Sequence, residues 1–288
     1  MNSNNPVFNN SPAFNGQGAS TYGNQTYPGA GAAYPAPGQQ YGDASSWGTG
    51  TPGAPVQADR ALTIDDVVQK TGISLGLVVV VAAALWFGTG DISTADGNYG
   101  MLIGLTAVGM IGGLIIGLVA AFKKSMLSPG LVLAYAALEG LFMGGISKVI
   151  QAQVDSPIVM QAILGTIAAA GGMLAAYKFF NIKIGDKFRR GFIAASFGFL
   201  GLMLLEMVLS AFGNGLGLFG DGGMGFVFAL AGLGFGVVGL LLDFDMVERG
   251  IAAGVSQRFA WTAAFGLTAS LVMVYFYLLR LLSILNQD

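Results

Sequence analysis

Residues 99–122 read YGMLIGLTAVGMIGGLIIGLVAAF and contain no charged side chain. A helix needs about 20 mostly apolar residues to cross the hydrocarbon core of a bilayer, and this stretch is long enough. Six other runs are similarly long and mostly apolar, although several carry one or two charged side chains, near residues 72–90, 130–151, 157–179, 190–213, 223–244 and 260–284. The sequence therefore predicts an all-α integral membrane protein with seven transmembrane helices in contact with the lipid bilayer.

The overall composition supports this prediction. The 288 residues are 54% hydrophobic and only 10% charged, whereas a soluble domain carries about 25% charged residues. The formal net charge is −2, so we do not expect nucleic acid as a partner. The spans are rich in glycine and alanine, which let helices approach closely in lipid. We therefore expect a compact helix bundle.

The chain contains neither cysteine nor histidine. Their absence excludes disulfides, thiolate metal sites, Ser-His-Asp triads and HExxH zinc sites. The last span has no lysine for a retinal Schiff base. An intramembrane aspartyl protease needs two acids on facing helices, which Asp243 and Asp245 on one helix do not supply. We therefore expect no enzyme and no cofactor, and any pH response must come from carboxylates, Lys, Tyr or Ser.

Residues 1–58 form a separate region of biased composition, which precedes a membrane domain at 59–288. Seven of the nine prolines lie in it, together with many Asn, Gly, Gln, Ser and Tyr residues, and Asp43 is its only charge. Such a segment buries too little apolar surface to offset its ordering entropy. We expect a disordered N-terminal tail, which either engages a protein partner or is simply solvated. No basic start or apolar core is present for a signal peptide.

A short amphipathic helix is predicted between the tail and the first span, at 62–70, LTIDDVVQK. Thr63 is a good N-cap residue, and Asp65 and Asp66 in the first turn favour the positive end of the helix dipole. This helix leads into the first apolar run.

Basic residues predict the orientation in the membrane, because cytoplasmic loops are enriched in Lys and Arg. Alternate loops, all on one side, hold 11 of the 13 basic residues: Arg60, Lys70, Lys123, Lys124, Lys178, Lys183, Lys187, Arg189, Arg190, Arg249 and Arg258. The loops on the other side carry Asp91, Asp96, Asp155 and Asp221. We expect a multi-pass protein of a plasma (inner) membrane, with the N-terminus cytoplasmic and the C-terminus outside.

Ionisable side chains inside a span are costly and therefore point to function. Glu139 lies near the middle of the third run and Glu206 in the outer half of the fifth. Glu139 either pins neighbouring helices as an acceptor or lines a path for cations or protons. For Glu206 we favour snorkelling or a structural hydrogen bond. Lys148 and Arg280 lie near outer ends, where long basic side chains usually reach the interface.

The sixth run ends in two further acids, in the stretch FGVVGLLLDFDMVERG at 235–250. Asp243 and Asp245 are two residues apart, so they point about 200° away from each other on a helix. Asp245 shares its face with Glu248 and Arg249, a favourable surface arrangement. Asp243 shares its face with two glycines, Gly236 and Gly239, which indicates a closely packed inward surface. Acids at a helix C-terminus also oppose the dipole, so we favour a function for this pair.

Several stretches, taken in order, resemble the Bax inhibitor-1 (transmembrane Bax inhibitor motif) family, in its bacterial branch. They are LEGLFMGGIS at 138–147, QAILGTIAAAGGMLAAYKF at 161–179, the acid near the end of the sixth run, and YFYLLRLLSIL at 275–285. The resemblance covers about residues 62–286. It implies a compact bundle with the last helix at its centre and a pH-sensitive calcium leak. In this family, two aspartates, one in each of the last two spans, share a proton and control the opening of the leak.

The paired aspartates carry over only in part. Asp245 aligns best with the family's acid in the sixth span, although Met246 and Val247 replace the usual Thr-Gln that follows it. The acid of the last span stands about ten residues before Leu-Leu-Arg, and Ser270 occupies that position here. The pair is therefore absent as the family has it. Asp243, Glu139 or Glu206 are the acids available to replace the missing partner.

Two functions follow as expectations. The first is a pH-sensitive leak channel for calcium or other cations, with Glu139, Glu206, Asp243 and Asp245 in ion passage or pH sensing. Calcium prefers oxygen ligands, so it would bind transiently near Asp243 and Asp245, and no permanent metal site is expected. The alternative is a non-conducting membrane scaffold or stress protein that recruits partners through residues 1–58.

Overall fold

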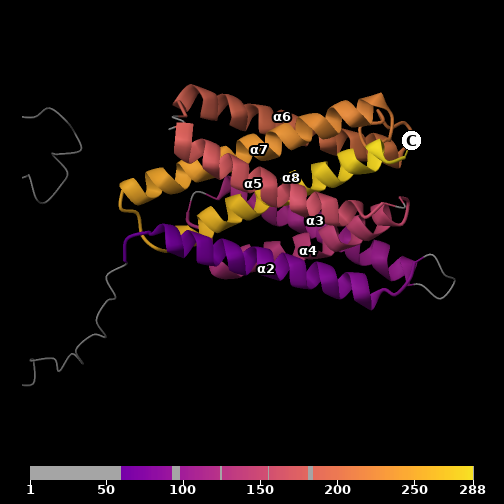
Figure 1. Ribbon diagram of the computed structural model, residues 1–288, viewed down its shortest axis with the longest axis horizontal. Coiled ribbons are helices and arrows are strands. Elements are labelled where there is room, and N and C mark those ends of the chain that lie inside the picture. Colours follow the sequence, from indigo (N-terminus) through magenta and orange to yellow (C-terminus); the bar gives the residue numbers. More distant parts are fainter. Residues whose placement is uncertain (1–59, 93–97, 124, 155, 181–183, 288) are drawn as a thin grey trace, which may run out of the picture. The chain divides into compact units, whose positions relative to one another are not determined.

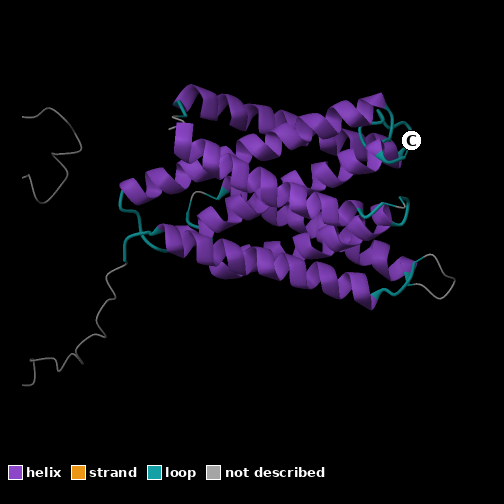
Figure 2. Ribbon diagram, viewed as in Figure 1, coloured by secondary structure: helices purple, strands orange, loops and turns teal. Residues whose placement is uncertain are grey.

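The computed structural model describes residues 60–92, 98–123, 125–154, 156–180 and 184–287. The predicted tail, residues 1–58, lies outside these ranges. In the described part the chain is helical, with connecting loops and turns (Figure 2). Seven of its helices are long and apolar enough to cross a membrane. This confirms the predicted all-α membrane fold with seven spans.

The helices run alongside one another and are joined by short connections (Figure 1). Their bounds are α2 (Ile64–Gly88), α3 (Tyr99–Phe122), α4 (Pro129–Gln151), α5 (Ile158–Phe180), α6 (Asp186–Ala211), α7 (Gly223–Ala252) and α8 (Phe259–Leu285). We call the end with the loops after α3, α5 and α7 the basic end, and the end with the loops after α2, α4 and α6 the acidic end. The names follow the charges of these loops.

The last helix, α8, is the centre of the bundle, as the resemblance implies. It packs against α2, α4, α5 and α7, and α4 also packs against α2 and α3. Small residues make these approaches possible. A Cβ added at Gly144 of α4 would lie 2.7 Å from the backbone of Ala82 in α2. In lipid such close backbone contact replaces the hydrophobic drive that water provides.

Helices α2 and α7 extend beyond the apolar runs into polar residues. The helix expected at 62–70 is the first part of α2, which begins at Ile64 and continues without a break to Gly88. Similarly, the sixth run was expected to end at 244, but α7 continues to Ala252. Asp243 and Asp245 therefore lie within a helix rather than at its C-terminus, and the dipole argument does not apply to them. In both places, polar residues continue a helix beyond its apolar part.

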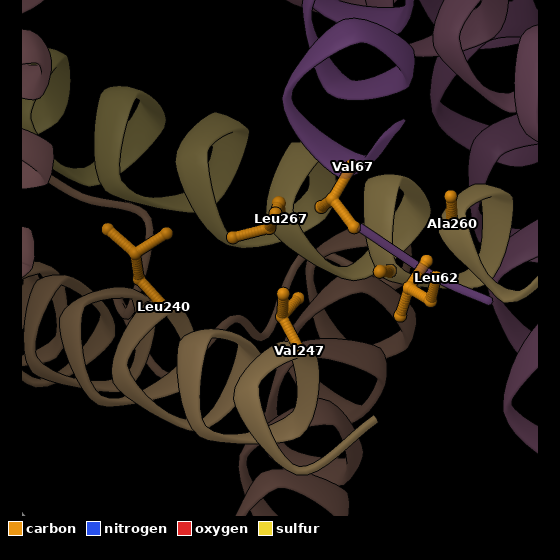
Figure 3. Close-up of a cluster of buried hydrophobic side chains, with 7 residues drawn as sticks. Leu62, Val67, Leu240, Val247, Ala260 and Leu267 are labelled. Carbon is orange, nitrogen blue, oxygen red and sulfur yellow. The ribbon is translucent and has the colours of Figure 1, made fainter. Parts of the chain in front are cut away.

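The basic end is tied together by the segment before α2, which we call the strap (Arg60–Leu62). The strap pairs with the α7–α8 loop through hydrogen bonds from the Leu62 amide to the Val255 carbonyl and from the Gln257 amide to the Arg60 carbonyl, both 2.8 Å. Figure 3 shows apolar side chains of the strap, α2, α7 and α8 gathered beside this pairing: Leu62, Val67, Leu240, Val247, Ala260 and Leu267. The first and last parts of the membrane domain thus share one small core.

Asp66 fixes the strap to α2. Its carboxylate, 4% exposed, accepts hydrogen bonds from the Thr63 hydroxyl (2.6 Å), Arg60 (2.7 Å) and the Gln257 side chain (2.7 Å). The Thr63 hydroxyl in turn accepts from the Asp66 amide, which completes a capping box. Thr63 is thus the N-cap that the sequence predicts, but Asp66 also connects three segments of the chain.

Replacing Asp66 with alanine should lower the free energy of unfolding by about 2 kcal/mol, because a helix cap and buried hydrogen bonds are lost together. Thermal unfolding of the protein in detergent measures the change. Asp65→Ala is the matched control, since Asp65 is exposed in the same turn. Equal destabilisation by the two substitutions would contradict the role of Asp66.

Candidate functional site

Asp243 faces the last helix. The Ser270 hydroxyl of α8 donates a 2.6 Å hydrogen bond to its carboxylate. One turn earlier on α8, a Cβ added at Gly266 would lie 2.6 Å from the same carboxylate. The side chain of Asp243 is therefore held in the seam between α7 and α8, where glycine leaves room for it.

Glycines of α7 form the rest of this seam, as their spacing predicts. Added Cβ atoms would lie 2.9 Å from a Val274 methyl at Gly236 and 3.0 Å from the Ser270 hydroxyl at Gly239. Asp243 thus continues a glycine face that lies directly against α8.

The resemblance favours Asp245 as the acid of the pair, but the structure places Asp243 opposite Ser270. Asp245 points away, toward α6. Its carboxylate lies 2.5 Å from Arg189 of α6 and 2.9 Å from Arg249, one turn later on α7. The surface position expected for Asp245 is also wrong, because this residue is 4% exposed. Asp243, in contrast, is half-buried. The pairing of Asp245 with Arg249 is confirmed, while Glu248 instead accepts a hydrogen bond from Tyr177.

The sequence predicts Arg189 only as a basic loop residue, whereas the structure makes it a partner of Asp245. Helix α6 begins at Asp186, four residues before the predicted start at 190. Arg189 therefore lies in the first turn of α6, where it reaches Asp245. The acid at Asp186, four residues before the predicted span, is the signal for an earlier start, since acids favour a helix N-terminus. Asp186 also lies 3.6 Å from Arg249.

Glu139 lies in the middle of α4 and is partly buried. A Cβ added at Gly113 of α3 would lie 3.1 Å from its carboxyl oxygen. Tyr135 lies one turn earlier on the same face of the helix, and its ring packs against Phe265 of α8 with ring centres 4.6 Å apart. Among the described residues Glu139 forms no ion pair, so both roles expected for it stay open.

Glu206 has a structural position. Its carboxylate is 2% exposed and accepts hydrogen bonds from three consecutive backbone amides of the α6–α7 loop, those of Leu216 (2.7 Å), Gly217 (3.1 Å) and Leu218 (3.1 Å). Three amide donors satisfy a carboxylate well without a cation. The geometry matches the structural hydrogen bond expected for Glu206 and leaves it no place beside Asp243.

The two basic residues near the acidic end bind acceptors in neighbouring segments at the ends of the spans. Lys148 is 8% exposed and donates to the Trp86 and Gly90 carbonyls and the Thr89 hydroxyl at the end of α2. Arg280 donates to the Gly220 carbonyl of the α6–α7 loop at 2.9 Å. Both therefore bind backbone acceptors at this end of the bundle, and the acceptor of Arg280 lies in an exposed part of the loop.

The described residues contain no group of three or more acidic side chains that could hold a metal ion. Asp243 and Asp245 face different helices, so they do not converge on one calcium ion. The acids differ instead in how their charge is compensated. Asp245 has two arginines and Glu206 has three amides, whereas Asp243 has one hydroxyl and, in the part of the chain described, no ion pair.

Seven apolar helices with carboxylates between them define a multi-pass integral membrane protein. Comparison with protein families matches residues 5–287 to the family described as Bax inhibitor 1 like. The chain belongs to this family, as its motifs indicate. None of the curated proteins compared with the chain matches it.

Proposed function

We propose that this protein is a pH-sensitive leak channel for calcium or related cations, in which Asp243 is the principal carboxylate. The observation that carries the proposal is the setting of Asp243 in the α7–α8 seam, with a hydroxyl as its hydrogen-bond partner and no basic partner among the described residues. An ionisable group at this depth is costly and points to ion or proton passage. Hard cations such as calcium bind carboxylate and hydroxyl oxygens.

Glu139 is the second carboxylate of the proposed path. It forms no ion pair in the described part of the chain, and it lies on α4, which packs against α8. Asp245 and Glu206 have other roles in this proposal. The Arg189 and Arg249 pairs make Asp245 a tie between α6 and α7.

The sign of the pH response follows from the chemistry of a carboxyl. An ionised Asp243 attracts a cation, whereas a protonated one has lost both its charge and an acceptor oxygen. Cation flux should therefore fall as the pH is lowered. Ser270 cannot ionise in this range, so Asp243 has no second carboxyl with which to share a proton across the seam.

Calcium flux into proteoliposomes tests the proposal. Asp243→Asn should lower the initial rate about tenfold, which corresponds to losing roughly 1.4 kcal/mol of favourable interaction with the cation at the barrier. Protonation of residue 243 should no longer contribute to the fall in calcium flux as the pH is lowered, because asparagine does not ionise. Glu139→Gln should reduce flux in the same direction.

Asp65→Asn is the control, because it removes an exposed acid outside the seam and should leave flux unchanged. Wild-type rates in both Asp243→Asn and Glu139→Gln would contradict the assigned path. If the unmodified protein carries no calcium above empty liposomes, the channel proposal fails. The scaffold function of residues 1–58 would then be the one to pursue.

We infer that the basic end faces the cytoplasm of a plasma (inner) membrane, with the N-terminus inside and the C-terminus outside. The basic loops support this orientation. Because the chain has no cysteine, single cysteines give a clean test in intact cells. An impermeant maleimide should label Asn214→Cys in the α6–α7 loop and not Ser125→Cys in the α3–α4 loop. Labelling of Ser125→Cys alone would reverse the orientation.

A further inference from the structure

Helix α6 is attached to the bundle differently from the other spans. It takes part in none of the extended backbone contacts between helices in the described part of the chain. At the basic end Arg189 binds Asp245 of α7, and near the acidic end Glu206 binds the α6–α7 loop. Between these two attachments, α6 contacts α7 and α8 only through long side chains.

Aromatic rings bridge this middle region. Phe199 of α6 stacks on Phe235 and on Phe228 of α7, with ring centres 4.7 Å apart in both cases. Phe192 lies 5.5 Å from Phe235, and the Tyr277 hydroxyl contacts the Met203 sulfur. Large side chains that bridge separated backbones leave space between them.

That space is a cavity of about 260 Å³ between α6 and the α7–α8 pair. Its walls are Phe192, Ser196, Phe199, Leu200, Met203, Phe235, Gly239, Ala269, Ser270 and Met273. From Phe192 to Met203 it extends about 16 Å along α6, at 1.5 Å per residue. For comparison, an apolar cavity of about 150 Å³ is enough to bind benzene.

The cavity walls are almost wholly apolar. The two hydroxyls in the walls are both committed as donors, Ser196 to the Phe192 carbonyl (2.8 Å) and Ser270 to Asp243 (2.6 Å). A buried water needs two to four polar partners, and apolar cavities without them stay dry. The shape and chemistry therefore suit a hydrocarbon chain rather than water or a polar ligand.

The cavity is also continuous with the surface that faces the bilayer. Every residue of its walls except Phe199 is partly exposed, so the space opens to the outside of the bundle. The opposite face of α6 presents large apolar side chains to the surroundings: Ile193, Phe197, Leu202, Leu205 and Val208. At the depth of a transmembrane helix, the medium outside this opening is lipid acyl chain.

We propose that the cavity between α6 and the α7–α8 pair is a binding site for one acyl chain of a bilayer phospholipid. The chain lies along Phe235 and Met273 and reaches the wall formed by Ser270. The acyl chain therefore contacts the residue that binds Asp243. This site does not depend on the proposed channel function.

Photolabelling of the full-length protein in nanodiscs tests the site. The nanodiscs contain a phospholipid with a diazirine in its acyl chain, and adducts are mapped by mass spectrometry without calcium or a pH gradient. Phe235 and Met273 should be labelled well above Leu240, which is 1% exposed on α7. Labelling of Phe235 and Met273 no higher than that of Leu240 would overturn the proposal.

Ala269→Phe places a ring in the cavity and should reduce labelling of Phe235 and Met273 to the level of Leu240. Ala195→Phe is the matched control, because Ala195 is exposed on α6 outside the cavity walls, and it should leave labelling unchanged. If Ala269→Phe fails to fold, Ser196→Leu fills the space from the α6 side with a smaller group. Unchanged labelling in a folded cavity-filling variant would exclude the site, whatever the flux measurements give.

Discussion

Replacing Lys148 with methionine should destabilise the protein by about 3 kcal/mol or more. The ammonium group donates to the Trp86 carbonyl (2.5 Å), the Gly90 carbonyl (2.5 Å) and the Thr89 hydroxyl (2.8 Å). Methionine fills similar space but removes all three hydrogen bonds, and a hydrogen bond that involves a charged group contributes about 1.5–3 kcal/mol. Thermal unfolding in detergent measures the loss, which should be accompanied by faster proteolysis after Trp86.

The matched control is Lys187→Met, which removes a lysine that is exposed at the start of α6. Surface substitutions away from special contacts usually change stability by no more than about 0.5 kcal/mol. A similar, small effect for both lysines would show that Lys148 does not hold the end of α2.

The second large effect is expected for Gly144→Leu. An added Cβ at this position would lie 2.7 Å from the Cα and carbonyl oxygen of Ala82, and backbone atoms cannot rotate away as a side chain can. The leucine must push α2 and α4 apart, which costs about 1–3 kcal/mol for overpacking alone. The lost helix contact adds to this cost, because lipid provides no compensating drive. The measurement is again the unfolding temperature.

Gly76→Leu on α2 is the control for the size of the side chain. Gly76 is exposed and has no neighbouring atom within 4 Å of an added Cβ. Leucine is also a better helix former than glycine, so this variant should be as stable as the natural protein. Comparable losses in the two variants would contradict the close approach of α2 and α4.

The sequence was sufficient to predict the spans because length and apolar character alone decide them. The prediction failed where a helix continues into polar residues, at 186–189 and 245–252, since water satisfies such residues in a helix as well as in a loop. The glycine face of the helix and the two-residue spacing of its acids were enough to predict that Asp243 and Asp245 point in different directions. The direction that each acid faces was therefore predictable in part.

The partners of the charged groups could not be predicted, because they lie on other helices. Nothing in the sequence near Asp245 indicates that Arg189, 56 positions away, binds it. Similarly, Lys148 and the end of α2 meet only through the packing of α2 against α4. Sequence patterns report which face of a helix is apolar, whereas the neighbour of that face depends on how the whole bundle is assembled.

The strap has a consequence for how the chain assembles during synthesis. Asp66 and Gln257, which hold it in place, are separated by 191 positions, so the strap has no partner until nearly all spans have been made. Loops of this length close slowly, and domains fold from the N-terminus during synthesis. The start of α2 must therefore wait, and the pairing of Leu62 with Val255 marks completion of the membrane domain. A chain cut short before residue 255 should insert its early spans but leave this end open to proteases.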